Sequence, residues 1–132
     1  MLRRVRYLAT ALALLVLAGC GEDSPPPEQQ VRSTVVEFGR ATAAKDYRAL
    51  CDRLLAPSLI EEVESIGLPC ELAMRRGLEQ VREPRLTIGR IEVRDDHASA
   101  QIRTTATGED PSQDTLELVN VDGSWKISSL GT

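Results

Sequence analysis

Pro84 divides this chain into two parts with different hydrophobic periods. Before Pro84, apolar residues recur at helical spacing, as Val31 and Val35 do. After it, apolar and polar residues alternate, with Ala98 and Ala100 as one example. A spacing of three to four residues is typical of an amphipathic helix, and a spacing of two is typical of a strand with one buried face. The chain therefore predicts an α+β fold in which helices come first and a sheet follows.

The first part predicts four helices. We place them at about residues 28–45, 47–55, 58–66 and 70–82. Asp46 is the expected N-cap of the second helix, and Ser58 with Glu61 has the form of a capping box for the third. Val36 and Ile66 are included among the inward-facing apolar residues. Pro84 ends the helical part because proline cannot continue a helix.

The second part predicts two antiparallel hairpins. Strands are expected at about 85–94, 97–105 and 115–121, and a fourth strand follows Gly123. The apolar parity switches at Gly89, which predicts a bulge or bend there. A turn at residues 95–96 would place Val93 opposite Ala98. The Asp122-Gly123 pair predicts a tight hairpin with Leu118 opposite Ile127 and Asn120 opposite Trp125.

The N-terminal residues have the layout of an export signal. Arginines at positions 3, 4 and 6 precede the apolar segment 7–17, which is short for a permanent membrane helix. The alternative is a buried or membrane-spanning N-terminal helix. The Leu17-Ala18-Gly19-Cys20 ending resembles the lipobox of bacterial lipoproteins. This resemblance implies removal of residues 1–19, a diacylglycerol on Cys20 and a domain held at the cell membrane outside the cytoplasm.

The Pro-rich residues that follow favour an extended, semi-rigid chain, so we expect a tether at 20–29 and a globular domain at 30–132. With Cys20 assigned to lipid, Cys51 and Cys70 remain as a pair. An exported protein can keep a disulfide between them. The alternative is a metal-binding or catalytic thiol, which would need histidines or further cysteines nearby, and the single histidine is the distant His97.

The charge balance argues against nucleic acid as a partner. The chain has 16 Lys and Arg against 20 Asp and Glu, and loss of the three arginines in residues 1–19 leaves 13 against 20. Nucleic-acid binding rewards clustered positive charge, which this composition lacks. The aromatic content of 3% also provides little surface on which bases would stack.

Two stretches resemble the NTF2-like superfamily, including its SnoaL-like and DUF4878-like members. They are "VVEFGRATAAKDYRALCDRLLAPSLIEEV", which is followed by the second cysteine, and the C-terminal "TLELVNVDGSWKISSL". The resemblance covers about residues 30–130. It implies helices packed on a curved antiparallel sheet of about four strands, as in the NTF2-like and cystatin-like cones. Some members of the superfamily use the cavity between helix and sheet for a ligand or for catalysis.

The candidate cavity-lining residues are Phe38, Tyr47, Ala98, Ala100 and Trp125. Trp125 is either a core residue or a platform for ligand stacking. Tyr47 either packs or points its hydroxyl into the cavity. The two alanines indicate either close packing of a helix or a void that accepts an apolar ligand.

No catalytic residue, metal ligand or cofactor site is expected. His97 lies beside two aspartates in a predicted turn, where it is either a solvated residue or an acid or base. The leading hypothesis is a lipid-anchored domain that binds a partner protein or a small ligand at the cell envelope. One alternative is an isomerase- or dehydratase-type enzyme that uses a buried carboxylate with Tyr47. Another is a homodimer formed through the Val119 and Val121 face.

Overall fold

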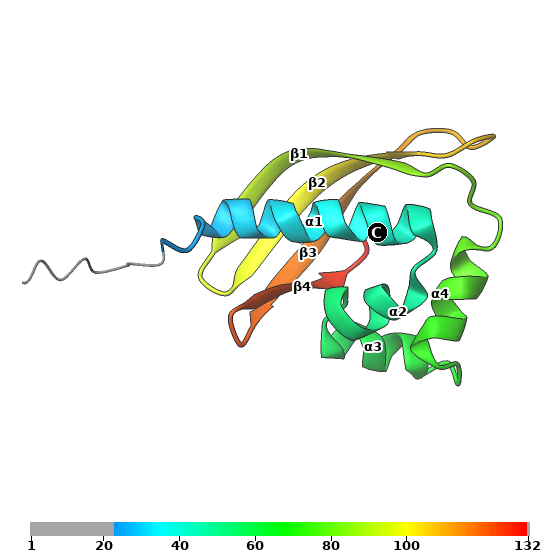
Figure 1. Cartoon of the computed structure of the whole chain (residues 1–132), viewed down its shortest axis with the longest axis horizontal. Coiled ribbons are helices and arrows are strands. Elements are labelled where there is room, and N and C mark those ends of the chain that lie inside the picture. The colour runs from blue at the N-terminus through cyan, green and yellow to red at the C-terminus, as the bar shows by residue number, and fades with distance from the viewer. Residues whose placement is uncertain (1–22, 132) are drawn as a thin grey trace, which may run out of the picture.

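The computed structural model describes residues 23–131, in which helices cover one face of a four-stranded antiparallel sheet (Figure 1). The elements are α1 (Pro27–Ala44), α2 (Tyr47–Ala49), the π-helix η1 (Leu50–Leu54), α3 (Pro57–Glu64), α4 (Cys70–Leu78), β1 (Arg85–Arg94), β2 (His97–Thr105), β3 (Ser112–Val121) and β4 (Ser124–Ser129). Helix α1 runs along the sheet, and the shorter helices gather at one end of it. The predicted α+β class is confirmed.

Helix α1 begins at Pro27, three residues before the expected start of the globular domain at residue 30. Proline is favourable at the first helical position because its fixed φ suits the helix and its missing N–H would have had no partner there. Val31 and Val35 face the sheet and are fully buried. Val36, which was predicted to widen the apolar stripe, is 40% exposed, so that prediction is wrong.

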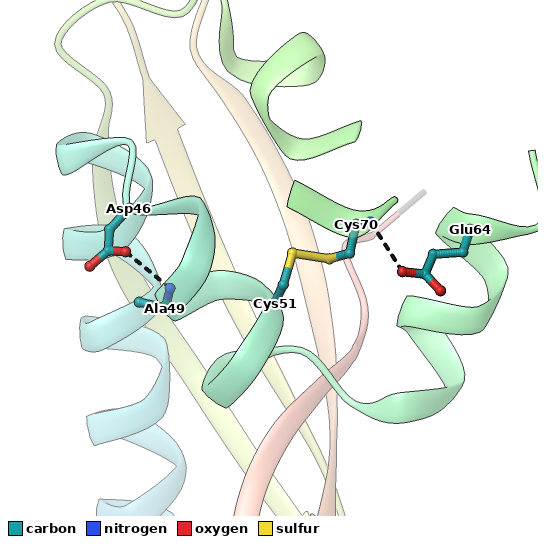
Figure 2. Close-up of a disulfide and its surroundings, with 5 residues drawn as sticks. All are labelled: Asp46, Ala49, Cys51, Glu64 and Cys70. Carbon is teal, nitrogen blue, oxygen red and sulfur yellow. Dashed lines mark hydrogen bonds between the residues drawn. A yellow bond between two sulfur atoms is a disulfide. The ribbon is translucent and has the colours of Figure 1, made fainter. Parts of the chain in front are cut away.

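The connection after α1 is shaped by Asp46. Its Oδ1 accepts a hydrogen bond of 3.0 Å from the Ala49 backbone N–H, which confirms the predicted cap (Figure 2). The predicted single helix over residues 47–55 instead changes to a π-helix after Ala49. Its final bond runs from the Leu55 N–H to the Leu50 carbonyl at 2.9 Å.

Helices α3 and α4 differ from the prediction at their ends. Ala56 is the N-cap of α3 and no side chain caps it, so the predicted Ser58 capping box is wrong. Proline is favourable at the first helical position, so α3 starts at Pro57, one residue before the predicted start at Ser58. Ile66 lies in the turn after α3 and is 72% exposed rather than buried. Helix α4 ends at Leu78 and not near residue 82, because Gly77 weakens its last turn.

The sheet order is β1-β2-β3-β4, and the pairing matches the sequence prediction closely. Val93 lies opposite Ala98, and Leu118 lies opposite Ile127. The β1–β2 register shifts between Ile88 and Ile91, as the parity switch at Gly89 predicted. Strand β3 starts at Ser112, three residues before its predicted start, because it follows β2 along most of its length.

The core has two connected parts. The larger part lies between α1, α3, α4 and the inner face of the sheet, with Val31, Val35, Leu116, Leu118 and Ile127 at its centre. The smaller part lies under α2 and η1 and includes Ala41, Ala49, Leu50 and Leu54. Phe38 and Met74 pack against both parts. Across residues 23–131, no helix has the length and apolar character needed to cross a membrane.

Candidate binding surfaces

The predicted cavity-lining residues are distributed through the core, and none of them lines either of the two hollows described below. Ala98, Ala100 and Trp125 are buried in the larger part of the core. Tyr47 packs at the edge of the smaller part, and Phe38 touches both. Ala98 and Ala100 share a core with the valines of α1, so close packing of a helix accounts for their small size.

Tyr47 has a partner other than a carboxylate. The guanidinium carbon of Arg75 in α4 lies 5.6 Å from the centre of the Tyr47 ring, within the range of a cation–π contact. Among residues 23–131, no charged or polar residue is fully buried. The buried carboxylate that the enzyme hypothesis requires is therefore not found in the described part of the chain.

His97 lies at the start of β2, beside the exposed β1–β2 turn. Its Nδ1 lies 2.7 Å from the Asp96 Oδ1, and both side chains are about two-thirds or more exposed. In the region from 23 to 131, no group of three or more His, Cys, Asp or Glu residues is arranged to hold a metal ion. The environment of His97 is that of a solvated turn residue.

The predicted disulfide is present. Cys51 in η1 and Cys70 at the start of α4 are bonded, with their Cα atoms 6.0 Å apart (Figure 2). The Glu64 Oε1 at the end of α3 accepts a hydrogen bond of 3.2 Å from the Cys70 backbone N–H. The disulfide and the Glu64–Cys70 hydrogen bond together hold η1, α3 and α4 against one another. A hollow of about 530 Å³ lies beside the disulfide, between Asp52, Glu64 and Arg75.

A hollow of about 760 Å³, here named the outer groove, lies on the sheet and has no helix residue in its lining. Along β2 and β3, the exposed side chains of the outer groove alternate with buried side chains that face the helices. The exposed side chains therefore point away from the helices. The polar lining side chains are Thr87, Gln101, Arg103, Gln113, Asp114, Thr115, Glu117 and Ser129. The outer groove crosses from β1 to the end of β4.

The outer groove is located where the sheet is irregular. The bulge near Gly89 bends β1. A Cβ atom at Gly89 would make ordinary van der Waals contact with Gln101, at 3.4 Å from its carbonyl oxygen and 3.5 Å from its Cβ. Glycine at this position adds no side chain to the lining of the outer groove.

The charged residues that line the outer groove have no ionic partner. Within residues 23–131, none of Arg103, Asp114 and Glu117 takes part in a salt bridge. The alternation along β2 places Gln101 and Arg103 on the face opposite to its buried residues, but it gives no sign that these two residues line a hollow. The groove depends on the bend of the sheet, which strand alternation does not encode.

No family model and no curated protein matches this chain. Similar solved structures exist, and one of them is the de novo designed NTF2-fold protein NT-9. It aligns with a TM-score of 0.54 and 18% identity over 80% of this chain and 87% of the designed one.

Two natural proteins give similar values. An NTF2-like protein of unknown function from Silicibacter pomeroyi DSS-3 aligns with a TM-score of 0.56 and 18% identity, over 76% of this chain and 89% of that one. Another from Shewanella baltica OS155 aligns with a TM-score of 0.53 and 14% identity, over 76% and 87%. These likenesses and the arrangement of helices and sheet show that the chain has the NTF2-like fold.

Proposed function

We propose that this chain is an exported, lipid-anchored binding domain that is attached through Cys20 to the outer side of the cell membrane. Two features support the proposal. The Leu17-Ala18-Gly19-Cys20 sequence has the form of a lipobox behind an export signal. The Cys51–Cys70 disulfide is the strongest support for export, because disulfides persist in oxidising compartments outside the cytoplasm.

The anchor is tested by mass spectrometry of the protein isolated from membranes. We expect a chain that begins at Cys20, carries acyl groups and has lost two hydrogens at the disulfide. Cys20→Ser is expected to lack the acyl mass and to keep residues 1–19. The double variant Cys51→Ser, Cys70→Ser is the control, and it should keep the acyl mass. A wild-type chain without acyl groups on Cys20 contradicts the proposal.

Within this function, we assign binding to the outer groove and a partner protein as the occupant. The groove has one cation, Arg103, and two anions, Asp114 and Glu117, with hydrogen-bonding groups between them. The predicted apolar ligand is less well supported, because the residues expected to line its cavity are part of the packed core.

Photo-crosslinking in intact cells tests this assignment. A photoreactive residue at Gln101 should form a discrete adduct, and one at Glu62 on α3 should not. Arg103→Glu should abolish the adduct at Gln101, whereas Arg76→Glu in α4 should leave it unchanged. Equal adducts at Gln101 and Glu62 would count against the groove.

A homodimer is the second candidate function. Val119 and Val121 lie on the outer face of β3 and are only partly buried, so they offer apolar contact to a second copy. Sedimentation of the domain should then show a dimer that Val121→Glu converts to a monomer. Identical monomeric behaviour of both proteins would exclude this candidate.

A further inference from the structure

The chain that leads to Cys20 leaves the domain at a particular end. Residues 23–26 precede α1, and both hairpin turns lie near the start of this helix (Figure 1). The Thr34 hydroxyl of α1 donates a hydrogen bond to the Trp125 carbonyl at 3.3 Å. The Asn120 N–H donates to the Asp96 carbonyl at 2.8 Å, which joins the two hairpins. We name this region the hairpin end: the start of α1 and the turns at 95–96 and 122–123.

The other end of the domain is formed by α3 and α4 (Figure 1), where the disulfide joins η1 to α4 (Figure 2). With 18 residues, α1 alone is about 27 Å long at about 1.5 Å per residue. The chain from Cys20 to Pro27 spans at most about 25 Å even when fully extended. A lipid on Cys20 therefore keeps the hairpin end within about one tether length of the bilayer.

From this geometry we propose that the hairpin end faces the lipid headgroups and that its aspartates keep the domain from settling on an anionic membrane. This inference rests on the lipid anchor proposed above. The two turns and their flanking residues contain Asp95, Asp96 and Asp122 against Arg94. At the start of α1, Glu28 is paired with Arg32 at 3.7 Å, so this helix adds little net charge. Repulsion from anionic lipid acts within a Debye length, about 8 Å at physiological salt.

This orientation leaves the outer groove accessible. Gln101 lies five residues along β2 from Asp96, which is about 17 Å at about 3.4 Å per residue. The outer groove would therefore lie to the side of the tether and away from the lipid headgroups. The competing arrangement lays the outer sheet face on the bilayer through Arg94 and Arg103, and in that arrangement lipid would cover the groove.

Nuclear magnetic resonance of the lipidated protein in nanodiscs distinguishes these arrangements. With a gadolinium-bearing lipid in zwitterionic discs, amide signals at 95–96 and 122–123 should be lost first. The loss should decrease along the strands toward Arg103 and be least at Ile66. In discs with anionic lipid at low salt, the signals at the hairpin end should recover.

Charge variants test the role of the aspartates. Asp95→Asn with Asp122→Asn should prevent the recovery, and asparagine tolerates the positive φ of 53° and 51° at these positions. Glu61→Gln with Glu62→Gln removes the same charge from α3 and should leave the recovery intact. Strongest signal loss at α3 and α4, or around Gln101 and Arg103, overturns the orientation.

Mass measurement of the same sample separates this inference from the proposed function. A sample without acyl groups on Cys20 refutes both the anchor and the orientation. An acylated sample whose hairpin end is not the part nearest the lipid refutes the orientation alone.

Discussion

Leu55 lies alongside Ile127 of β4 in an isolated parallel bridge, and the next residue fixes this arrangement. The Ala56 N–H donates a hydrogen bond of 2.7 Å to the Ile127 carbonyl. Leu55 and Ile127 are 1% and 0% exposed. The connector between η1 and α3 therefore covers part of the free edge of β4, the last strand of the sheet. This edge would otherwise offer unpaired backbone groups to another chain.

Ile127→Ala should destabilise the domain strongly, because it opens a cavity where the helical layer meets β4. Truncation of a buried isoleucine to alanine costs about 2–5 kcal/mol. Urea unfolding followed by Trp125 fluorescence would measure the loss. Val121→Ala, at the partly exposed end of β3, should cost less than Ile127→Ala. Similar losses for the two variants would contradict the central position of Ile127 in the core.

Loss of the disulfide should also lower stability. The bond joins residues separated by 19 positions. On the chain-entropy model, a loop of this size corresponds to about 3 kcal/mol of stabilisation. The double variant Cys51→Ala, Cys70→Ala should therefore unfold at clearly lower urea concentration. Wild-type protein treated with a thiol reductant should shift in the same direction, and an unchanged midpoint in both experiments would contradict the prediction.

The hairpins were predictable because their turns determine the register. The Asp122-Gly123 turn fixes the pairing of β3 with β4. A shift of this register by one residue would move the apolar residues of the slipped strand to the solvent side. The helix ends were less predictable. A serine with a glutamate three residues later suits a capping box, but Pro57 provided a competing start signal one residue earlier. The sequence alone does not decide between two local preferences of similar strength.

The candidate site was less accessible to sequence analysis than the fold. Cysteine pairing followed from counting, since only two cysteines remain once Cys20 is assigned to lipid. The outer groove combines residues from all four strands with Gly131 after β4, and the pairing of the strands brings them side by side. Strand alternation identifies which side chains face solvent, but it does not indicate where the solvent face is hollowed.

Ala100→Leu should test whether the inner face of the sheet is filled. Ala100 is fully buried between Ile91 and Leu116 of the neighbouring strands. Additional methylene groups in a packed core cost about 1–3 kcal/mol. Thermal or urea unfolding should therefore show a destabilised variant. A neutral or more stable variant would instead indicate a void of the kind that an apolar ligand occupies, and would revive that hypothesis.

Two glycine substitutions should act in opposite directions. Gly123 has a φ of 87° in the β3–β4 turn, where a Cβ atom introduces strain although no neighbour lies within 4 Å. Gly123→Ala should therefore cost about 1–2 kcal/mol, the penalty for an L-residue in the left-handed region.

Gly77 is helical in α4 and has equally open surroundings. Gly77→Ala should stabilise the domain by about 0.5 kcal/mol, because alanine loses less backbone entropy in a helix. Urea unfolding of both variants separates backbone strain from steric contact, since neither new methyl group meets a neighbour. Two variants that shift in the same direction would contradict the backbone conformation assigned to one of these glycines.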